Sequence, residues 1–462
     1  MKYSDEDTIA AISTSPGAGG IGIIRISGAM AVQAADNIFR ISTKRAADIN
    51  TVARMSSHTL KHGYIIDPET HEMIDECMLS LMKAPRSYTK EDVVEINCHG
   101  GSAVMRKILS LIFKSGVRPA EPGEFTKRAF LNGRIDLSMA EAVMDIINAG
   151  SEAGRKAAAA QLSGRLKHEI NGIREKLKLC LAEIEVALDY PEYEMDEDTA
   201  SAAMILLSET KEILSGLSKT FYRGRIIKEG IKTAIAGIPN AGKSSLLNLL
   251  SGRERAIVTD IPGTTRDTIE EAVDLEGIPI ILTDTAGLRE TDDTVEKIGV
   301  DRSYEAIEGS DIVLFVADIS SVERAELSKK LYDEIRSGRI ITLLNKSDIA
   351  DEGAAAVFGE GIRISVKNGQ GIEEIIKKIR ETAELGSLGE DRTIITSERH
   401  KQLLDKALEA LDKASESYEM RMPLDCISYD IWECGKYLGE ITGEAIEDDV
   451  METIFSKFCL GK

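Results

Sequence analysis

The segment Gly237-Ile238-Pro239-Asn240-Ala241-Gly242-Lys243-Ser244 has the spacing G-x-x-x-x-G-K-[ST]. An apolar run, 233–236, precedes it, and a helix-forming run, 245–250, follows it. A buried strand, a tight glycine turn and a helix N-terminus form the context in which this pattern binds phosphate. In such a loop, backbone N–H groups surround the β-phosphate, Lys243 reaches the β- and γ-phosphate oxygens, and Ser244 binds Mg²⁺. The segment therefore predicts a nucleoside-triphosphate site.

Two further motifs each follow an apolar run that predicts a strand. Asp284-Thr285-Ala286-Gly287 comes after residues 280–283, and Asn345-Lys346-Ser347-Asp348 comes after residues 340–344. A carboxylate at the first strand end can hold a Mg²⁺-bound water, and the glycine N–H can contact the γ-phosphate. Asp348 can accept two N–H bonds from guanine, whereas adenine offers no matching donors. Together with Ser365-Val366-Lys367, placed where a base-stacking loop belongs, these motifs predict GTP binding.

The hydrolytic machinery differs from that of Ras-like enzymes. Leu288 stands where those enzymes carry the glutamine that orients the attacking water, so the catalytic group must come from elsewhere. Residues 259–267 are the predicted switch I, with Thr265 as a hydroxyl ligand for Mg²⁺. No arginine finger is obvious, and the side chain of Asn240 with switch I carbonyls could hold a monovalent cation instead. The expected nucleotide-binding residues are Asn240, Ala241, Gly242, Lys243, Ser244, Ser245, Thr259, Asp260, Ile261, Pro262, Gly263, Thr264, Thr265, Asp284, Thr285, Ala286, Gly287, Asn345, Lys346, Asp348, Ser365, Val366 and Lys367.

Outside this module the sequence has two kinds of region, one with mixed strand-like and helix-like patterns and one with helical patterns only. Residues 1–120 mix strand-like and helix-like runs and predict an α+β domain, in which the glycines of 17–22 precede a strand and so do not open a dinucleotide-binding helix. Helical patterns fill 121–221 and 386–462, and Ser138-x-x-Glu141 predicts a capping box. We therefore expect a multidomain α/β and α protein. One helical domain is built from two chain segments, and a Ras-like G domain with a doubly wound, mostly parallel sheet is inserted over 222–385.

Composition restricts the partners and the compartment. The formal net charge of −21 is unfavourable for indiscriminate binding to nucleic acid, so we expect no DNA partner, and any RNA partner needs a local basic patch or a second protein. The six cysteines are scattered without a C-x-x-C pair, which argues against a disulfide framework or a zinc site. No apolar run approaches the length of a membrane span, and the acidic start lacks the apolar core of a secretory signal. These features predict a cytoplasmic protein.

Five stretches, found from near the start to the end of the chain, resemble the MnmE (TrmE) family of GTPases. They are 23–28, 122–130, 237–248, 263–267 and 458–462. The resemblance implies a homodimer and a K⁺-stimulated GTPase whose G domains dimerise on GTP. It also implies that Glu296 is the general base acting through a water, with Lys243 also in the catalytic set, and that K⁺ is held by Asn240, Thr259, Ile261 and Thr264.

The same resemblance implies a folate site and a modification reaction. The family's N-terminal domain binds 5-formyl- or 5,10-methylene-tetrahydrofolate, and the matching positions here are Arg25, Glu95, Arg134 and Lys462. Arg134 stands where many members have lysine. With an FAD-dependent MnmG-like partner in a heterotetramer, the family adds an aminomethyl or carboxymethylaminomethyl group to C5 of the wobble uridine of certain tRNAs. Ammonium and glycine both remain candidate amine donors, and a catalytic role is implied for Cys459.

Less specific interpretations stay open beside these. Arg25 and Glu95 could form a surface ion pair, Cys459 could pack as a small buried hydrophobe, and His99 is interpreted as structural because no partner base is evident. A switch GTPase of ribosome or RNA assembly would explain the G domain without modification chemistry. A dimer scaffold with vestigial hydrolysis is a third reading, and such a site should not distinguish K⁺ from Na⁺.

Overall fold

The computed structural model describes residues 7–15, 17, 19–42, 50–189, 197–252, 270–275, 278–284, 306–335, 339–351, 353–383, 393–444 and 448–461. Two compact units make up the chain: Met1–Met144 with Thr442–Lys462, and Asp145–Ile441. The predicted boundaries after 120 and 385 stay predictions, and the compact units divide at other points. No helix in the described parts of the chain has the length and apolar character needed to cross a membrane.

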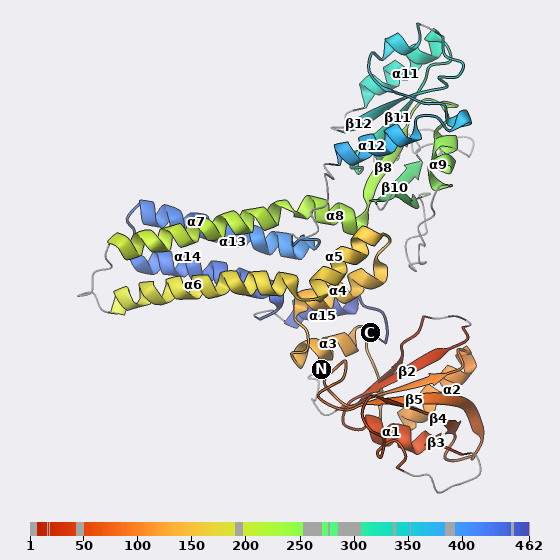
Figure 1. Ribbon diagram of the computed structural model, residues 1–462, viewed down its shortest axis with the longest axis vertical. Helices are drawn as coiled ribbons and strands as arrows, with labels where there is room; N and C mark the ends of the chain where they lie inside the picture. The colour runs from red at the N-terminus through yellow and green to blue at the C-terminus, as the bar shows by residue number, and fades with distance from the viewer. Residues whose placement is uncertain are drawn as a thin grey trace. The chain divides into compact units, whose positions relative to one another are not determined.

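The first unit is built on a seven-stranded sheet of order β3-β4-β5-β6-β2-β1-β7. Its strands are β1 (Ile9–Ile12), β2 (Gly22–Ser27), β3 (Phe39–Arg40), β4 (Thr59–Ile66), β5 (Met73–Met82), β6 (Val93–Cys98) and β7 (Arg118–Pro119). Apolar side chains alternate along β5, where Cys77, Leu79 and Leu81 are buried and their neighbours are not. Helices α1 (Ala31–Ile38) and α2 (Ser102–Lys114) pack against this sheet (Figure 1). Their apolar side chains belong to the same core. β2 begins at Gly22, so the glycines before it do lead into a strand.

The C-terminal segment packs into the same unit. α15 (Asp448–Ser456) lies against α3 (Glu124–Leu131), and the rings of Phe130 and Phe455 are 6.2 Å apart between centroids.

The next helix along the chain after α3 is α4 (Leu137–Asn148), and Asp136 Oδ1 accepts a hydrogen bond from Met139 N at 2.8 Å at its start. The predicted capping box at Ser138 is therefore wrong, because the cap is Asp136 and Ser138 already lies inside the helix.

The second unit contains a helical layer made from both sides of the nucleotide-binding module. Its helices are α5 (Glu152–Leu162), α6 (Arg165–Asp189), α7 (Glu197–Lys219), α8 (Phe221–Glu229), α13 (Glu398–Glu419) and α14 (Leu424–Thr442). α6, α7, α13 and α14 run side by side (Figure 1) and share one apolar core, which includes Leu177, Leu214, Leu404 and Leu438. The expectation of one helical domain built from two chain segments is confirmed.

The rest of the second unit is a six-stranded sheet of order β13-β12-β11-β8-β10-β9. Its strands are β8 (Ile231–Ala236), β9 (Glu270–Leu275), β10 (Ile278–Asp284), β11 (Ile312–Asp318), β12 (Ile340–Asn345) and β13 (Ile362–Arg363), flanked by α9 (Lys243–Ser251), α11 (Val322–Glu334) and α12 (Ile372–Thr382). Every pair is parallel except β9 with β10. All of β11 is buried, as expected for a parallel strand covered on both faces. The doubly wound, mostly parallel G domain is confirmed.

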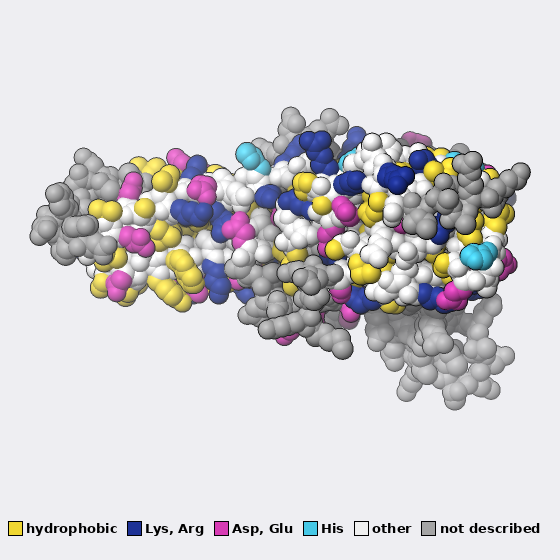
Figure 2. Space-filling model, turned by 90° about the horizontal axis from the view of Figure 1, so that it is seen from below, with side chains coloured by type: hydrophobic (Ala, Val, Ile, Leu, Met, Phe, Trp, Pro, Cys, Tyr) yellow, Lys and Arg dark blue, Asp and Glu magenta, His cyan; other side chains and the backbone are white. Residues whose placement is uncertain are grey.

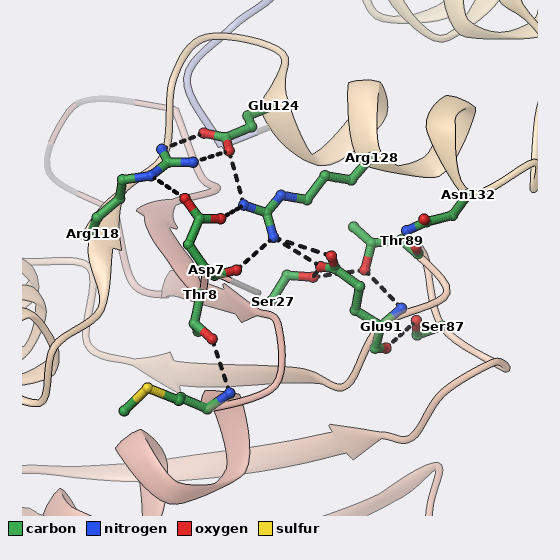
Figure 3. A network of polar contacts seen from close by, with 11 residues as sticks. Asp7, Thr8, Ser27, Ser87, Thr89, Glu91, Arg118, Glu124, Arg128 and Asn132 are labelled. Atoms are coloured by element: carbon green, nitrogen blue, oxygen red, sulfur yellow. Dashed lines mark hydrogen bonds and ion pairs between the residues drawn. The ribbon is translucent and has the colours of Figure 1, made fainter. Parts of the chain in front are cut away.

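Two arginines and three carboxylates form a network that ties α3 to the sheet of the first unit (Figure 3). Arg128 donates to Asp7 Oδ1 at 2.5 Å, Glu91 Oε1 at 3.1 Å and Glu124 Oε1 at 3.0 Å. Arg118 donates to Asp7 and Glu124 at 2.7 and 2.6 Å. Burial opposes ionisation, but hydrogen bonds from the two arginines hold the pKa of Asp7 and of Glu124 below their ordinary values. The network therefore favours the fold only while these carboxyls are ionised.

We expect Glu124→Ala to lower the stability of the first unit by about 1–3 kcal/mol, because Arg118 and Arg128 each lose hydrogen bonds to their most deeply buried carboxylate partner. Since the folded pKa values are depressed, the stabilisation is complete above the unfolded values of 3.8 and 4.5 and is lost as pH falls through the folded ones. Native-state hydrogen exchange of β1 and α3 amides measures both effects. Glu69→Ala, which removes an exposed ion pair with Lys114, is the control, and an equal loss there would contradict the account.

Candidate functional site

The phosphate-loop motif lies between β8 and α9, so the predicted strand–turn–helix context is confirmed. Gly237 and Gly242 have φ of 151° and 102°, and Asn240 has φ of 60°. A Cβ at Gly237 would lie 2.3 Å from Val316 O, and one at Gly242 would lie 2.4 Å from Asn345 Nδ2. Only glycine fits at these two positions, because both the backbone conformation and the space exclude a side chain.

The buried Lys243 side chain turns back into the loop. Its ammonium donates to the carbonyl oxygens of Gly237 at 2.8 Å and Ile238 at 3.0 Å. Ser244 and Ser245 are exposed in the first turn of α9, where backbone N–H groups have no acceptor within the helix. A cation and a helix N-terminus thus meet at one point, which is the chemistry that a phosphate chain requires.

Asn345, the first residue of the motif 345–348, connects the phosphate loop to the predicted base-stacking loop 365–367. Its Nδ2 donates to Ala241 O at 2.7 Å, and its Oδ1 accepts from Val366 N at 3.1 Å. Ser365 Oγ donates to Asp348 Oδ1 at 2.8 Å and so orients that carboxylate. The fold therefore brings the phosphate loop, 237–244, together with two stretches that lie about a hundred residues or more further along the chain, 345–348 and 365–367.

Asp318, at the end of β11, is a site residue that the motifs did not reveal. Its side chain is fully buried and accepts from Lys346 Nζ at 2.8 Å and Arg324 Nε at 3.0 Å. Burial opposes ionisation, but hydrogen bonds from Lys346, Ser320 and Arg324 lower its pKa to about 2. An aspartate directly after the apolar run 312–317 was the available signal. The carboxylate fixes the lysine of the guanine-recognition motif.

A second cluster forms in the first unit around Arg25, on β2. Arg25 Nε donates to Glu95 Oε1 of the neighbouring strand β6 at 2.8 Å, and its NH1 donates to Gly461 O at 3.4 Å. The ion pair that the alternative interpretation proposed does form, and it is half-buried, with side chains that are 17% and 22% exposed. Ser13 Oγ also donates to Gly461 O, at 3.1 Å, and fixes the end of the chain beside β1.

Tyr88 lies between two arginines of this cluster. The guanidinium carbons of Arg25 and Arg134 are 5.6 and 4.7 Å from its ring centroid, and Arg134 donates to its carbonyl oxygen at 3.2 Å. Cys459 is exposed, which does not fit a small buried hydrophobe. Two cations, a carboxylate, an aromatic ring and a thiol-bearing chain end therefore belong to one unit.

His99 has a partner that the sequence did not show. Its Nδ1 is 2.6 Å from Asp75 Oδ1, and its backbone N–H donates to the other carboxylate oxygen at 2.8 Å. The ring is 70% exposed while the Asp75 side chain is 10% exposed, so the carboxylate orients an otherwise open imidazole.

Several predicted site residues lie outside the described residues: Thr259, Asp260, Ile261, Pro262, Gly263, Thr264, Thr265, Thr285, Ala286, Gly287, Glu296 and Lys462. Asp284 ends β10, but its side chain is not among those described. Within the described ranges, no group of three or more His, Cys, Asp or Glu side chains could hold a metal ion.

These features define a P-loop nucleotide-binding protein of the GTPase class, with a G domain inserted into a helical layer. Two family models match the chain: the GTP-binding protein TrmE N-terminus over residues 8–134, and the MnmE helical domain over residues 137–459. The chain therefore belongs to the MnmE family.

Curated relatives agree along the full length. Proteins named tRNA modification GTPase MnmE from Acetivibrio thermocellus, Carboxydothermus hydrogenoformans and Enterococcus faecalis are 49%, 48% and 45% identical to this chain. Each alignment covers 99% of this chain and 98–100% of the relative. Among solved structures, the G domain of the T. maritima FeoB iron transporter matches 33% of this chain and 98% of that chain, at 28% identity and a TM-score of 0.26.

We expect Asn345→Ala to loosen the phosphate loop, because it leaves Ala241 O and Val366 N without their partner. The native loop conformation should lose about 1–3 kcal/mol of stability, the usual effect when a buried backbone group loses its hydrogen bond. Hydrogen exchange of peptides covering 237–246 and 364–369 in the nucleotide-free chain measures it. Asn248→Ala, an exposed position on α9, is the control. Equal exchange in the two variants would contradict the assignment.

Proposed function

We propose that this chain is a K⁺-stimulated GTPase that modifies tRNA together with an FAD-dependent MnmG-like partner. The product carries an aminomethyl or carboxymethylaminomethyl group at C5 of the wobble uridine, position 34. The one-carbon unit comes from 5-formyl- or 5,10-methylene-tetrahydrofolate. Membership of the MnmE family supports the reaction class. The observation that supports the folate-dependent modification is the Arg25 cluster, because GTP binding and hydrolysis alone do not require such a cluster.

The nucleotide part of the proposal uses the stretches that Asn345 connects, together with the predicted switch I and Glu296. Asp348 pairs with guanine, Lys243 binds the phosphates, and Ser244 and Thr265 would hold Mg²⁺. Asn240, Thr259, Ile261 and Thr264 would hold K⁺, which would supply positive charge to balance that of phosphoryl transfer. Glu296 acts as the general base through a water, a role that Leu288 cannot take because its side chain forms no hydrogen bonds.

The folate half uses the Arg25 cluster. Its donor set fits tetrahydrofolate, because Arg25 and Arg134 can pair with carboxylates, Glu95 can accept from the N–H groups of the pterin, and Tyr88 offers an aromatic face. Lys462 adds a further positive charge. The folate would supply a one-carbon unit, while these side chains bind and orient it.

Coupling and partners complete the proposal. GTP-dependent dimerisation of the G domains orders the folate site for transfer, in a homodimer that joins two partner subunits in a heterotetramer. Cys459, exposed near the end of the chain, takes part in the modification, with ammonium or glycine as amine donor. On the face drawn in Figure 2, basic side chains are interspersed with acidic and apolar ones. With the net charge of −21, this supports a partner that provides much of the tRNA surface.

Glu296→Ala is expected to retain GTP binding and to lose turnover by at least about 100-fold, the scale of a missing general base. GTP hydrolysis in KCl and in NaCl, with fluorescent-nucleotide affinity measured in parallel, tests both the base and the cation. Glu374→Ala removes an exposed carboxylate of α12 in the same domain and should behave as wild type. Unchanged turnover in Glu296→Ala would refute the assigned base, and equal wild-type rates in both salts would refute the K⁺ site.

Arg25→Gln is expected to weaken binding of 5-formyl-tetrahydrofolate by at least about 10-fold, because a charged hydrogen bond is lost and Glu95 loses its partner. Calorimetric titration of the full chain measures this. Arg106→Gln, an exposed position on α2, removes the same charge from the same unit and should leave the affinity unchanged. Equal affinities for the two variants would exclude Arg25 from the site.

A further inference from the structure

Arg324 contacts the phosphate loop from outside the three motifs. It lies in the first turn of α11, where Ser321 Oγ caps the helix by accepting from Arg324 N at 3.3 Å. From there, one end of the guanidinium donates to Asp318 Oδ2 at 3.0 Å, and NH2 donates to Pro239 O at 2.8 Å. The side chain thus bridges the end of β11 and the middle of the loop.

We propose that Arg324 is a positioning residue that fixes the peptide between Pro239 and Asn240 and thereby the placement of the Asn240 side chain. A peptide unit is planar, so holding the Pro239 carbonyl also sets the direction of Asn240 N and the position of its Cα. Asn240 has φ of 60°, in the left-handed region that asparagine adopts more readily than most residues other than glycine, and contacts from its surroundings stabilise this conformation. The inference rests on the proposed role of Asn240 in holding K⁺.

The pattern of donors around the loop supports this role. Lys243 donates to the carbonyls of Gly237 and Ile238, and Asn345 donates to that of Ala241. The carbonyl of Pro239 receives its bond from Arg324. Loss of the arginine therefore removes one of these four side-chain hydrogen bonds to loop carbonyls, the one next to Asn240.

Asp318 keeps the arginine in place and links it to guanine recognition. Its Oδ2 accepts from both Arg324 and Lys346, and the carboxylate is fully buried. An exposed ion pair would contribute little, because water competes for both groups. A guanidinium that bridges a buried carboxylate and a backbone carbonyl keeps a defined geometry, since its planar fork sets the direction of each donor.

Arg324→Gln in the full chain tests the proposal by two measurements. Hydrogen exchange of the 237–243 segment, without nucleotide and in NaCl, should accelerate by at least about 5-fold, since a charge-assisted hydrogen bond is lost. The K⁺ concentration for half-maximal GTP turnover should rise by a similar factor. Lys329→Gln removes the same charge from the same helix, where the amine pairs with Asp333 and faces Tyr332, and should leave both values as in wild type.

A second variant, Arg324→Lys, keeps the positive charge but loses the planar guanidinium. Its exchange rate in the loop and its half-maximal K⁺ concentration should lie between those of wild type and Arg324→Gln. Wild-type exchange in the loop of Arg324→Gln would overturn the proposal. So would a uniform loss of protection across β8 and β11, since that would show a role in stability alone. If wild type does not distinguish K⁺ from Na⁺, the proposed cation site fails, whereas faster exchange confined to the loop still supports the positioning role.

Discussion

The G domain depends on how the carbonyl oxygens of one short loop are satisfied. A phosphate loop must turn its N–H groups toward the ligand, which leaves its carbonyls in need of donors elsewhere. Here the donors come from Lys243, Asn345 and Arg324. The register of the sheet makes this possible, because it pairs Asp318 of β11 directly with Asn345 of β12. Nucleotide recognition and the shape of the loop therefore share the same hydrogen bonds.

In the first unit, side-chain donors satisfy buried carboxylates, much as they satisfy the loop carbonyls of the G domain. Arg118 and Arg128 together bind three carboxylates, of which Glu91 is bound by Arg128. Glu91 is close in sequence to Tyr88, the aromatic residue of the Arg25 cluster. Ser27 Oγ adds a hydrogen bond to Glu91 at 2.6 Å. A buried ionic network of this kind sets conformation rather than adding much net stability. We interpret it as a structural support for the neighbouring Arg25 cluster.

The sequence predicted those parts of the site whose chemistry requires fixed residue types at fixed spacing. The loop at 237–244 and the Asn345 motif belong to this class, and parallel strands that end at one sheet edge bring them together. Arg324 and the Asp75 partner of His99 could not be predicted, because each contact joins elements through side chains that no motif specifies. The packing of Phe455 against Phe130 was equally hidden, since it spans most of the chain.

The central claim is that the Arg25 cluster and the end of the chain serve tRNA modification, with the G domain as its GTP-driven control. The most direct test is nucleoside mass spectrometry of tRNA from cells that lack this protein, with wild type or Cys459→Ser restored separately. The account predicts that the C5-modified wobble uridine disappears and returns only with wild type. Intact modification in the deletion cells would contradict it and would favour a switch GTPase without modification chemistry.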